Sequence, residues 1–220
     1  MKLPVVEMFV SINGEGQRAG ELAAFIRFRG CNLNCSYCDT LWANSPDAPA
    51  DELEPSKIVE FVNSSGAKNV TLTGGEPLLQ KNISELINAL IRSGHRVEIE
   101  TNGSISIAEL ASSQLRPAFT LDYKLPDSGM EKTMLTDNYR YLTETDTVKF
   151  VVSSLTDMER AVEIIDEFSL TKKCAVYFSP VFDRIEPSVI VDFMKERRLS
   201  EVRLQLQLHK FIWAPDKRGV

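Results

Sequence analysis

Short apolar runs of strand length alternate along the chain with longer segments whose apolar residues recur at helical spacing. The strand-like runs are Ala23–Phe28, Val70–Leu72, Val97–Ile99, Phe119–Leu121, Val148–Val152, Ala175–Phe178 and Val202–Leu206. The helical segments are Pro55–Asn63, Ile83–Ile91, Met158–Phe168 and Ser188–Arg197. Strands that alternate with helices predict an α/β fold with a parallel sheet and right-handed crossovers. Because the helical cover is incomplete after Leu121, we expect a partial barrel that forms one domain over residues 1–220.

Polar residues gather where the predicted strands end. The strand ends run into Thr73–Pro77, Glu100–Gly103, Asp122–Lys124 and Ser153. The carboxyl ends of parallel strands share one edge of a sheet, and ligands bind at that edge. The sequence therefore predicts a ligand site there. The Pro-, Asp- and Ala-rich segment Ser45–Glu54 is expected to be a loop.

Composition excludes several classes of protein. The chain is 43% hydrophobic and 25% charged, with a net charge of −6 and no run rich in lysine or arginine, so nucleic acid is not an expected partner. No apolar stretch is long enough to span a bilayer, no targeting peptide is visible, and a membrane partner is not expected. Unpaired cysteines are typical of a reducing compartment, so a cytoplasmic location is predicted.

Three of the four cysteines lie within eight residues, as Cys31, Cys35 and Cys38 in a CxxxCxxC pattern. Three thiolates can hold three irons of a [4Fe-4S] cluster and leave the fourth iron open for a small molecule. A zinc site completed by Cys174, His95 or His209, free core cysteines and a disulfide framework are the alternatives. Polar residues between the cysteines disfavour core packing, and a zinc ion would need a ligand from far along the chain. The cluster is the favoured interpretation.

The cysteine loop, with Tyr37 before its last cysteine, resembles the signature of the radical S-adenosylmethionine (SAM) superfamily. Thr73-Gly74-Gly75-Glu76-Pro77 resembles a second signature of that superfamily. The resemblance implies a partial, incomplete TIM-like barrel whose open iron chelates the amino and carboxylate groups of SAM. An electron delivered through the cluster then splits SAM into methionine and a 5′-deoxyadenosyl radical, which takes a hydrogen from the substrate.

More particular motifs resemble the 7-carboxy-7-deazaguanine synthase family. They are Phe9–Gly16, Arg27, Phe28–Cys31, Cys38–Thr40 and the ending Leu208–Trp213 with Arg218–Val220. The resemblance implies a lyase that contracts 6-carboxy-5,6,7,8-tetrahydropterin to 7-carboxy-7-deazaguanine, with release of ammonia, in queuosine-type 7-deazapurine biosynthesis. It also implies a reducing electron donor, such as a flavodoxin-like protein, and a homodimer.

The resemblance assigns roles to individual residues. Cys31, Cys35 and Cys38 are the catalytic cluster ligands. The SAM contacts are Tyr37, Cys38, Asp39, Gly74, Gly75, Glu76, Glu100, Thr101, Asn102, Asp122, Tyr123, Lys124 and Ser153. The substrate contacts are Ile12, Asn13, Gly14, Glu15, Arg27, Thr73 and His209. Thr40 is implied to ligate a Mg²⁺ ion that bridges to the substrate. Asn13 and Asp122-Tyr123-Lys124 depart from the commoner Gln and Ser-Pro-Lys.

Simpler interpretations stay open for several of these residues. Arg27, a charge in an apolar strand, could form an internal ion pair with a glutamate instead of binding a substrate carboxylate. Thr40 could be a helix cap, and His209 could be a histidine satisfied within the fold. The polar groups after the later strands could be solvated loops.

Two other functions use part of the same pattern. A related radical SAM activase, which generates a glycyl radical on a partner protein, would share the cysteine loop but would not need Arg27. A cluster-bearing electron carrier would fill every cluster position with cysteine and would not use the Gly74-Gly75 motif. The ring-contracting enzyme is favoured over both.

Overall fold

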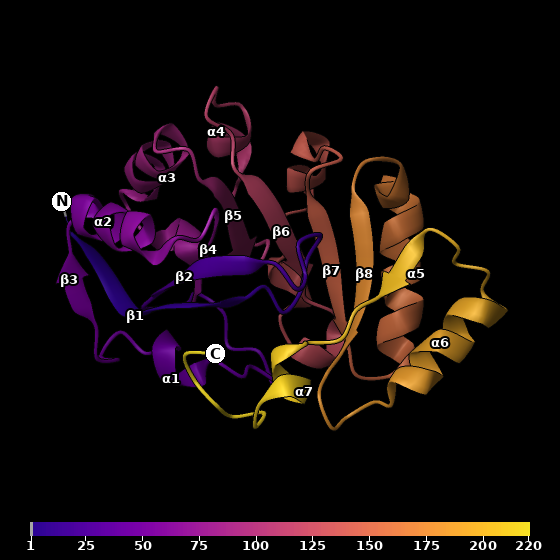
Figure 1. Ribbon diagram of the computed structural model, residues 1–220. Helices are drawn as coiled ribbons and strands as arrows, with labels where there is room; N and C mark the ends of the chain where they lie inside the picture. Colours follow the sequence, from indigo (N-terminus) through magenta and orange to yellow (C-terminus); the bar gives the residue numbers. More distant parts are fainter. Residues whose placement is uncertain (1) are drawn as a thin grey trace.

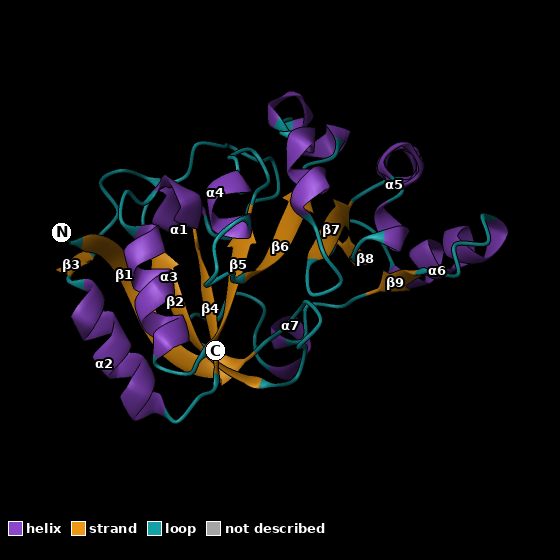
Figure 2. Cartoon of the chain, turned by 90° about the horizontal axis from the view of Figure 1, so that it is seen from above, coloured by secondary structure: helices purple, strands orange, loops and turns teal. Residues whose placement is uncertain are grey.

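A single twisted sheet runs through the computed structural model, which describes residues 2–220. Within this range nine strands pair in the order β3-β1-β2-β4-β5-β6-β7-β8-β9. The strands are β1 (Leu3–Ile12), β2 (Leu22–Phe28), β3 (Asp51–Leu53), β4 (Asn69–Gly74), β5 (Arg96–Thr101), β6 (Ala118–Tyr123), β7 (Thr147–Val152), β8 (Ala175–Pro180) and β9 (Val202–Leu204). The run β2-β4-β5-β6-β7-β8-β9 is parallel throughout, whereas β1 pairs antiparallel with both β2 and β3. The sheet forms an open arc (Figure 2).

Helices and short 3₁₀ turns connect the strands (Figure 1). The α-helices are α1 (Leu41–Asn44), α2 (Pro55–Ser65), α3 (Ile83–Arg92), α4 (Ala108–Ala111), α5 (Leu155–Phe168), α6 (Pro187–Glu196) and α7 (His209–Ile212). The 3₁₀ turns are η1 (Pro77–Leu79), η2 (Pro126–Ser128), η3 (Glu131–Thr133), η4 (Thr136–Tyr141) and η5 (Leu170–Lys172). No helix within residues 2–220 is long and apolar enough to cross a membrane.

The apolar core lies between the sheet and its outer helices. Alternate residues of β7, Val148, Phe150 and Val152, are fully buried on this side. Helix α3 covers β5 on the same side with an apolar stripe that includes Leu86 and Leu90, spaced one helical turn apart. The residues between these core positions face the inside of the arc, where the polar groups collect. Strand alternation thus separates a hydrophobic outer layer from a polar inner face.

The expected α/β architecture is confirmed, and the barrel is incomplete. Only the turns η2, η3 and η4 connect β6 to β7, in agreement with the predicted gap after Leu121. Pro126 and Gly129, which has φ +75°, break the chain there into short turns.

Two strands were not predicted from the pattern. β1 begins at Leu3, but its burial does not alternate cleanly because its later residues line a cavity, so the strand period is hidden. β3 occupies Asp51–Leu53 inside the segment predicted to be a loop, and its pairing with β1 is what makes it a strand. Both belong to the antiparallel edge of the sheet.

The carboxyl ends of the parallel strands meet at one edge of the sheet. In Figure 1, helices α1 and α7 and the C terminus lie below that edge. The cysteine loop follows β2 at this edge. The segment after β9 crosses the same edge.

Candidate active site

One cavity of about 300 Å³ lies at the carboxyl edge of the parallel strands. Residues from β1, β2, β4, β5, β6 and β7 line it, together with the cysteine loop and residues 215–220. Most residues with a predicted role line this cavity: Ile12, Gly14, Glu15, Arg27, Cys31, Cys35, Tyr37, Cys38, Asp39, Thr40, Thr73, Gly74, Gly75, Glu100, Thr101, Asn102, Asp122, Lys124 and His209. The fold thus brings together residues that are nearly 200 positions apart in the sequence.

The three loop cysteines are free thiols at one wall of the cavity. Burial raises the pKa of Cys31 and of Cys35. Amides point at two of the sulfurs: Asn44 Nδ2 donates to Cys38 Sγ at 3.4 Å, and Asn102 Nδ2 donates to Cys31 Sγ at 3.7 Å. Such donors stabilise a sulfur that carries negative charge, as a cluster thiolate does. The donor set therefore fits an iron–sulfur cluster.

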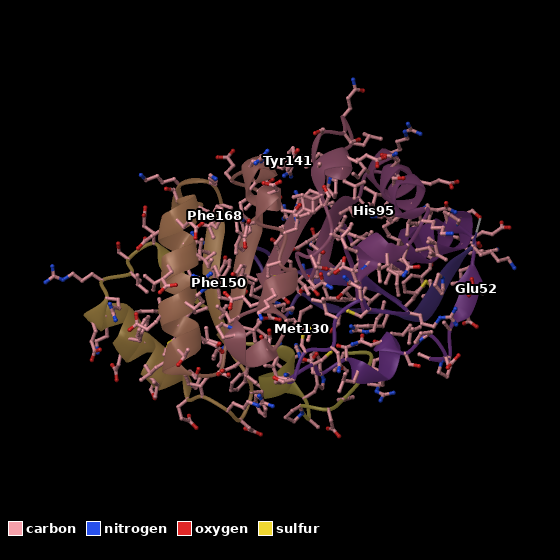
Figure 3. The ribbon with its side chains drawn as sticks, turned by 180° about the vertical axis from the view of Figure 1, so that it is seen from behind. Glu52, His95, Met130, Tyr141, Phe150 and Phe168 are labelled. Atoms are coloured by element: carbon pink, nitrogen blue, oxygen red, sulfur yellow. The ribbon has the colours of Figure 1, made fainter. Side chains whose placement is uncertain are left out.

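A single zinc ion does not fit this site. Within residues 2–220, no three side chains of histidine, cysteine, aspartate or glutamate converge closely enough to hold one metal ion. Cys174 is buried and points to the Leu170 carbonyl at 3.6 Å. His95 bonds Asn63 Oδ1 at 2.8 Å, beside the start of β5. In Figure 3 His95 lies toward the upper edge of the sheet, whereas Met130, which follows β6, lies toward the lower edge.

The cysteine loop is fixed against the glycine pair at the end of β4. Gly75 N donates to Phe28 O at 3.1 Å, and Glu76 N donates to Gly30 O at 2.8 Å. A Cβ atom on Gly75 would lie 1.9 Å from Gly30 O, and Gly74 has a φ of +133°. Only glycine fits this close approach of two backbones. The glycines keep the backbone at the cavity wall, where it can meet a ligand directly.

Glu76 follows the glycine pair, and its contact with SAM stays a prediction. Its side chain is fully buried and does not line the cavity. It accepts hydrogen bonds from Leu78 N at 3.0 Å, Thr101 Oγ1 at 2.8 Å and Asn102 N at 2.7 Å. Burial raises the pKa of Glu76 to about 7. Glu76 therefore joins the end of β4 to the end of β5 from behind the cavity.

Three further side chains also face away from the cavity. Asn13 accepts from Thr71 Oγ1 at 2.8 Å, and its backbone is paired with Gly20 and Glu21. Tyr123 packs against Phe150 on the core side, because it alternates with Asp122 along β6. Ser153 bonds Asp127 and Asp157. The ligand contacts assigned to these residues stay predictions, and their side chains make these contacts within the fold.

Arg27 forms an ion pair and still lines the cavity. Its Nε donates to Glu7 Oε1 at 2.7 Å, as the simpler interpretation expected, and its guanidinium stacks over Trp42 at 5.7 Å. Among the hydrogen bonds of residues 2–220, Glu7 engages only the Nε atom. The two terminal nitrogens are left for a ligand, and a guanidinium offers a carboxylate a planar pair of donors.

Glu15 is held in the cavity from three directions. Ser179 Oγ donates to its Oε1 at 3.0 Å, Gln207 Nε2 donates to its Oε2 at 3.2 Å, and Lys149 Nζ lies 3.2 Å from the same oxygen. Next to it, His209 packs so closely that a Cβ on Gly14 would lie 2.8 Å from its Nδ1. Burial lowers the pKa of His209, which favours the neutral ring.

Thr40 occupies the N-cap position of α1 but makes no capping hydrogen bond through its side chain. Its Oγ1 donates instead to Asp39 Oδ1 at 2.9 Å, and it lines the cavity. Lys210 Nζ lies 3.2 Å from Asp39 Oδ2. Burial acts to raise the pKa of Asp39, but Lys210 and the Thr40 hydroxyl outweigh it and the pKa is lowered. The helix-cap interpretation of Thr40 is wrong, and its hydroxyl faces the cavity.

Carboxylates from the neighbouring strands β5 and β6 also line the cavity. Thr73 Oγ1 donates to Glu100 Oε2 at 2.9 Å, and burial raises the pKa of Glu100. Lys124 Nζ lies 2.8 Å from Asp122 Oδ2. Burial acts to raise the pKa of Asp122, but Lys124 and Lys149 outweigh it. These residues suit a ligand that carries hydroxyl groups and positive charge.

Glu98 lies deeper, two residues before Glu100 on the same face of β5. Thr120 Oγ1 donates to its Oε1 at 2.6 Å, and the backbone of Gly16 covers the same oxygen. Burial raises the pKa of Glu98 to about 7.

Several residues that line the cavity had no role predicted from the sequence. They are Lys149, Asn44, Gln207, and Lys210 and residues 215–220, of which Lys210 and Arg218–Val220 lie in the family-like ending. Lys149 carried a usable signal, because a charge within the apolar run Val148–Val152 is as unusual as Arg27 in its own strand. Nothing in the pattern marked Asn44, at the end of α1, or Gln207, in the segment between β9 and α7.

Comparisons of sequence place the chain close to characterised enzymes. A model of the radical SAM superfamily matches residues 25–123. The chain is 56% identical to 7-carboxy-7-deazaguanine synthase of Clostridium acetobutylicum, over 100% of both chains. It is 37% identical to 7-carboxy-7-deazaguanine synthase of Chlorobaculum tepidum, over 99% of this chain and 97% of the relative.

Comparison with solved structures supports the fold. The crystal structure of QueE from Escherichia coli superimposes with a TM-score of 0.72 at 24% identity, covering 94% of each chain. Streptococcus suis SuiB matches with a TM-score of 0.56 at 15% identity, over 81% of this chain and 47% of that one.

The contact between Gly75 and Gly30 predicts a specific defect. Gly75→Ala should displace the start of the cysteine loop, because its methyl group would overlap Gly30 O, and iron per chain after anaerobic reconstitution should fall well below wild type. Gly94→Ala is the matched control: Gly94 has φ +89° but open space around its Cβ direction. Both variants should lower the melting temperature, but only Gly75→Ala should lose iron. Full iron content in Gly75→Ala would contradict the packing argument.

Glu98 predicts a pH dependence of stability. A carboxyl with a pKa raised to about 7 in the folded chain, against 4.5 for the ordinary group, binds more protons folded than unfolded. Its contribution to stability is therefore complete below pH 4.5 and is lost as the pH rises toward 7. Glu98→Gln stays neutral, so urea unfolding should show the variant gaining stability relative to wild type between pH 5 and pH 8. An unchanged difference across this range would rule out a buried, proton-binding Glu98.

Proposed function

This chain belongs to the 7-carboxy-7-deazaguanine synthase family of radical SAM enzymes, and we propose that it contracts 6-carboxy-5,6,7,8-tetrahydropterin to 7-carboxy-7-deazaguanine with release of ammonia. The reaction is a carbon–nitrogen lyase step that leads to queuosine and related 7-deazapurines. The whole chain acts as one radical SAM domain. The observation that carries this proposal is that one cavity contains the cysteine loop, Arg27, and Glu15 with its partners Lys149 and Gln207, here called the Glu15 cluster.

Cys31, Cys35 and Cys38 would hold a [4Fe-4S] cluster at one end of that cavity. Bound there with SAM, the cluster supplies the 5′-deoxyadenosyl radical chemistry of the superfamily. The backbone at Gly74 and Gly75 offers close approach to the methionine part of SAM, and Glu100 and Asn102 suit its ribose hydroxyls. Asp122, which lines the cavity, would offer an anion to the positively charged SAM, in a sequence that departs from the commoner Ser-Pro-Lys.

The other end of the cavity suits a carboxylated pterin. The terminal nitrogens of Arg27 match the substrate carboxylate, and the carboxyl oxygens of Glu15 match the amino-pyrimidine edge, which presents N–H donors. Ile12 and Gly14 contribute the backbone next to Glu15. Thr73 and the neutral His209 are the remaining proposed substrate contacts. Thr73 lies beside the carboxylate of Glu100, and His209 packs against Gly14.

The Thr40 hydroxyl is the proposed protein ligand of a Mg²⁺ ion. Mg²⁺ keeps several waters and takes few protein ligands, so one hydroxyl together with substrate oxygens is a sufficient set. Bound there, the ion would polarise the substrate. The missing helix-capping bond of Thr40 supports this role, because the hydroxyl faces the cavity instead.

Further properties follow from the family as proposals. A reducing protein, flavodoxin-like or other, would deliver the electron. The enzyme would act as a homodimer in the cytoplasm, where free cysteines are maintained. The glycyl-radical activase is not retained, because Arg27 and the Glu15 cluster have no use in a site that acts on a protein backbone.

The direct test is anaerobic turnover. The reconstituted protein, SAM, a reductant and 6-carboxytetrahydropterin should give 7-carboxy-7-deazaguanine, identified by mass. Cys35→Ala should form none, because it loses a cluster ligand. Cys174→Ala is the control, since Cys174 is buried away from the cavity, and it should stay active. SAM cleavage without the deazapurine would make the substrate wrong. No SAM cleavage by a fully loaded wild-type protein would overturn the enzyme itself.

A further inference from the structure

Lys149 is a buried lysine that lines the cavity. It lies in the middle of β7, and its side chain is only 8% exposed. A buried ammonium group is costly unless anions surround it. Here the Nζ atom lies 3.2 Å from Glu15 Oε2 and 3.3 Å from Asp122 Oδ1. Burial alone would lower the pKa of Lys149, but Asp122, Glu15 and Glu100 raise it well above its ordinary value.

Lys149 is fixed from the side opposite Glu15. Asp122 and Lys149 are direct neighbours across the β6–β7 ladder, so their side chains leave the same face of the sheet. Lys124 Nζ holds the other oxygen of Asp122 at 2.8 Å. The chain Lys124–Asp122–Lys149–Glu15 therefore alternates in charge from one half of the cavity to the other.

Glu15 itself comes from a turn, not from a strand. It follows β1 by three residues, and Gly16 next to it is clamped by Gln205, which accepts from Gly16 N at 2.7 Å and donates to Gly16 O at 3.0 Å. Its carboxylate is only 9% exposed. Ser179 and Gln207 are neutral donors, and the charged or titratable groups facing Glu15 are Lys149, Glu100 and His209, with Asp122 on the far side of Lys149.

We propose that Lys149 is the positioning residue of the substrate half: it holds the Glu15 carboxylate in place and aimed into the cavity, and so sets the recognition of the pterin edge. The inference rests on the proposed function, because it assigns Glu15 to that edge. Without Lys149, Glu15 loses its only ion-pair partner among residues 2–220 and keeps the Glu100 carboxylate nearby. Its carboxylate would then turn away from the cavity, which removes an acceptor from the substrate.

The test is binding of 6-carboxy-5,6,7,8-tetrahydropterin by calorimetry, anaerobically, to cluster-loaded protein with SAM and no reductant. Lys149→Met should weaken affinity by roughly tenfold to a hundredfold, the range for removing one partner of a buried charged pair. Lys149→Arg keeps the charge and should recover most of the affinity. Lys173→Met is the matched control, since Lys173 is a half-buried lysine outside the cavity that bonds Tyr139 O, and it should bind as wild type does.

A double-mutant cycle separates positioning from general structural damage. If Lys149 acts through Glu15, then adding Lys149→Met to Glu15→Gln should change affinity by less than about twofold. Additive losses would overturn the proposal. If Lys149→Met fails to load iron, the double variant Lys149→Gln/Asp122→Asn replaces it, because it removes a cation and an anion together. This double variant should still lose affinity for the pterin, and wild-type affinity in it would also overturn the proposal.

Two outcomes distinguish the proposed function from this inference. A wild-type protein that binds no pterin would overturn both. Wild-type binding that Lys149→Met leaves unchanged would overturn the inference alone.

Discussion

The close contact between the backbones of Gly75 and Gly30 is the constraint on which the site depends. It continues the pairing of β2 with β4 past the ends of both strands, so the cysteine loop leaves the sheet at a fixed height beside the glycine pair. No side chain fits between the two segments. Glu76, buried behind the glycines, extends the same connection to Asn102, which in turn points an amide at Cys31. The proposed cluster site and the proposed SAM site are thereby parts of one rigid edge.

The inner face of the half-barrel presents a second physical problem, since it gathers charge in a largely dry space. Glu15, Glu100 and Asp122 would repel one another, but Lys149 lies at ion-pair distance from Glu15 and Asp122, and Lys124 at ion-pair distance from Asp122. Buried ion pairs of this kind add little net stability, because removing the charges from water is costly. Their value lies in specificity: the carboxylates of Glu15 and Asp122 are held in one place by partners within the fold. The site is organised in advance by contacts among its own residues.

The sequence predicted much of this arrangement, and the failures have physical causes. The order of strands and helices followed from periodicity, and the open arc followed from the missing helix after Leu121. The strands β1 and β3 escaped because β1 serves both the sheet and the cavity, which hides its period, and β3 depends on pairing with β1. Arg27 was found as a charge in an apolar strand, and Lys149 showed the same signal. The direction of Glu76, by contrast, is set by hydrogen bonds to residues some 25 positions away, and no local pattern encodes them.

The two halves of the cavity should bring C6 of the substrate next to the adenosyl carbon of SAM. The most direct measurement uses 6-carboxytetrahydropterin with deuterium at C6 and follows the label by mass. Because loss of ammonia alone relates the substrate to the product, the hydrogen that the radical removes must be returned, and the 5′ carbon of SAM and of 5′-deoxyadenosine should gain deuterium as 7-carboxy-7-deazaguanine forms. Product formation that leaves SAM and 5′-deoxyadenosine free of deuterium would contradict this arrangement, because the hydrogen would then come from another carbon.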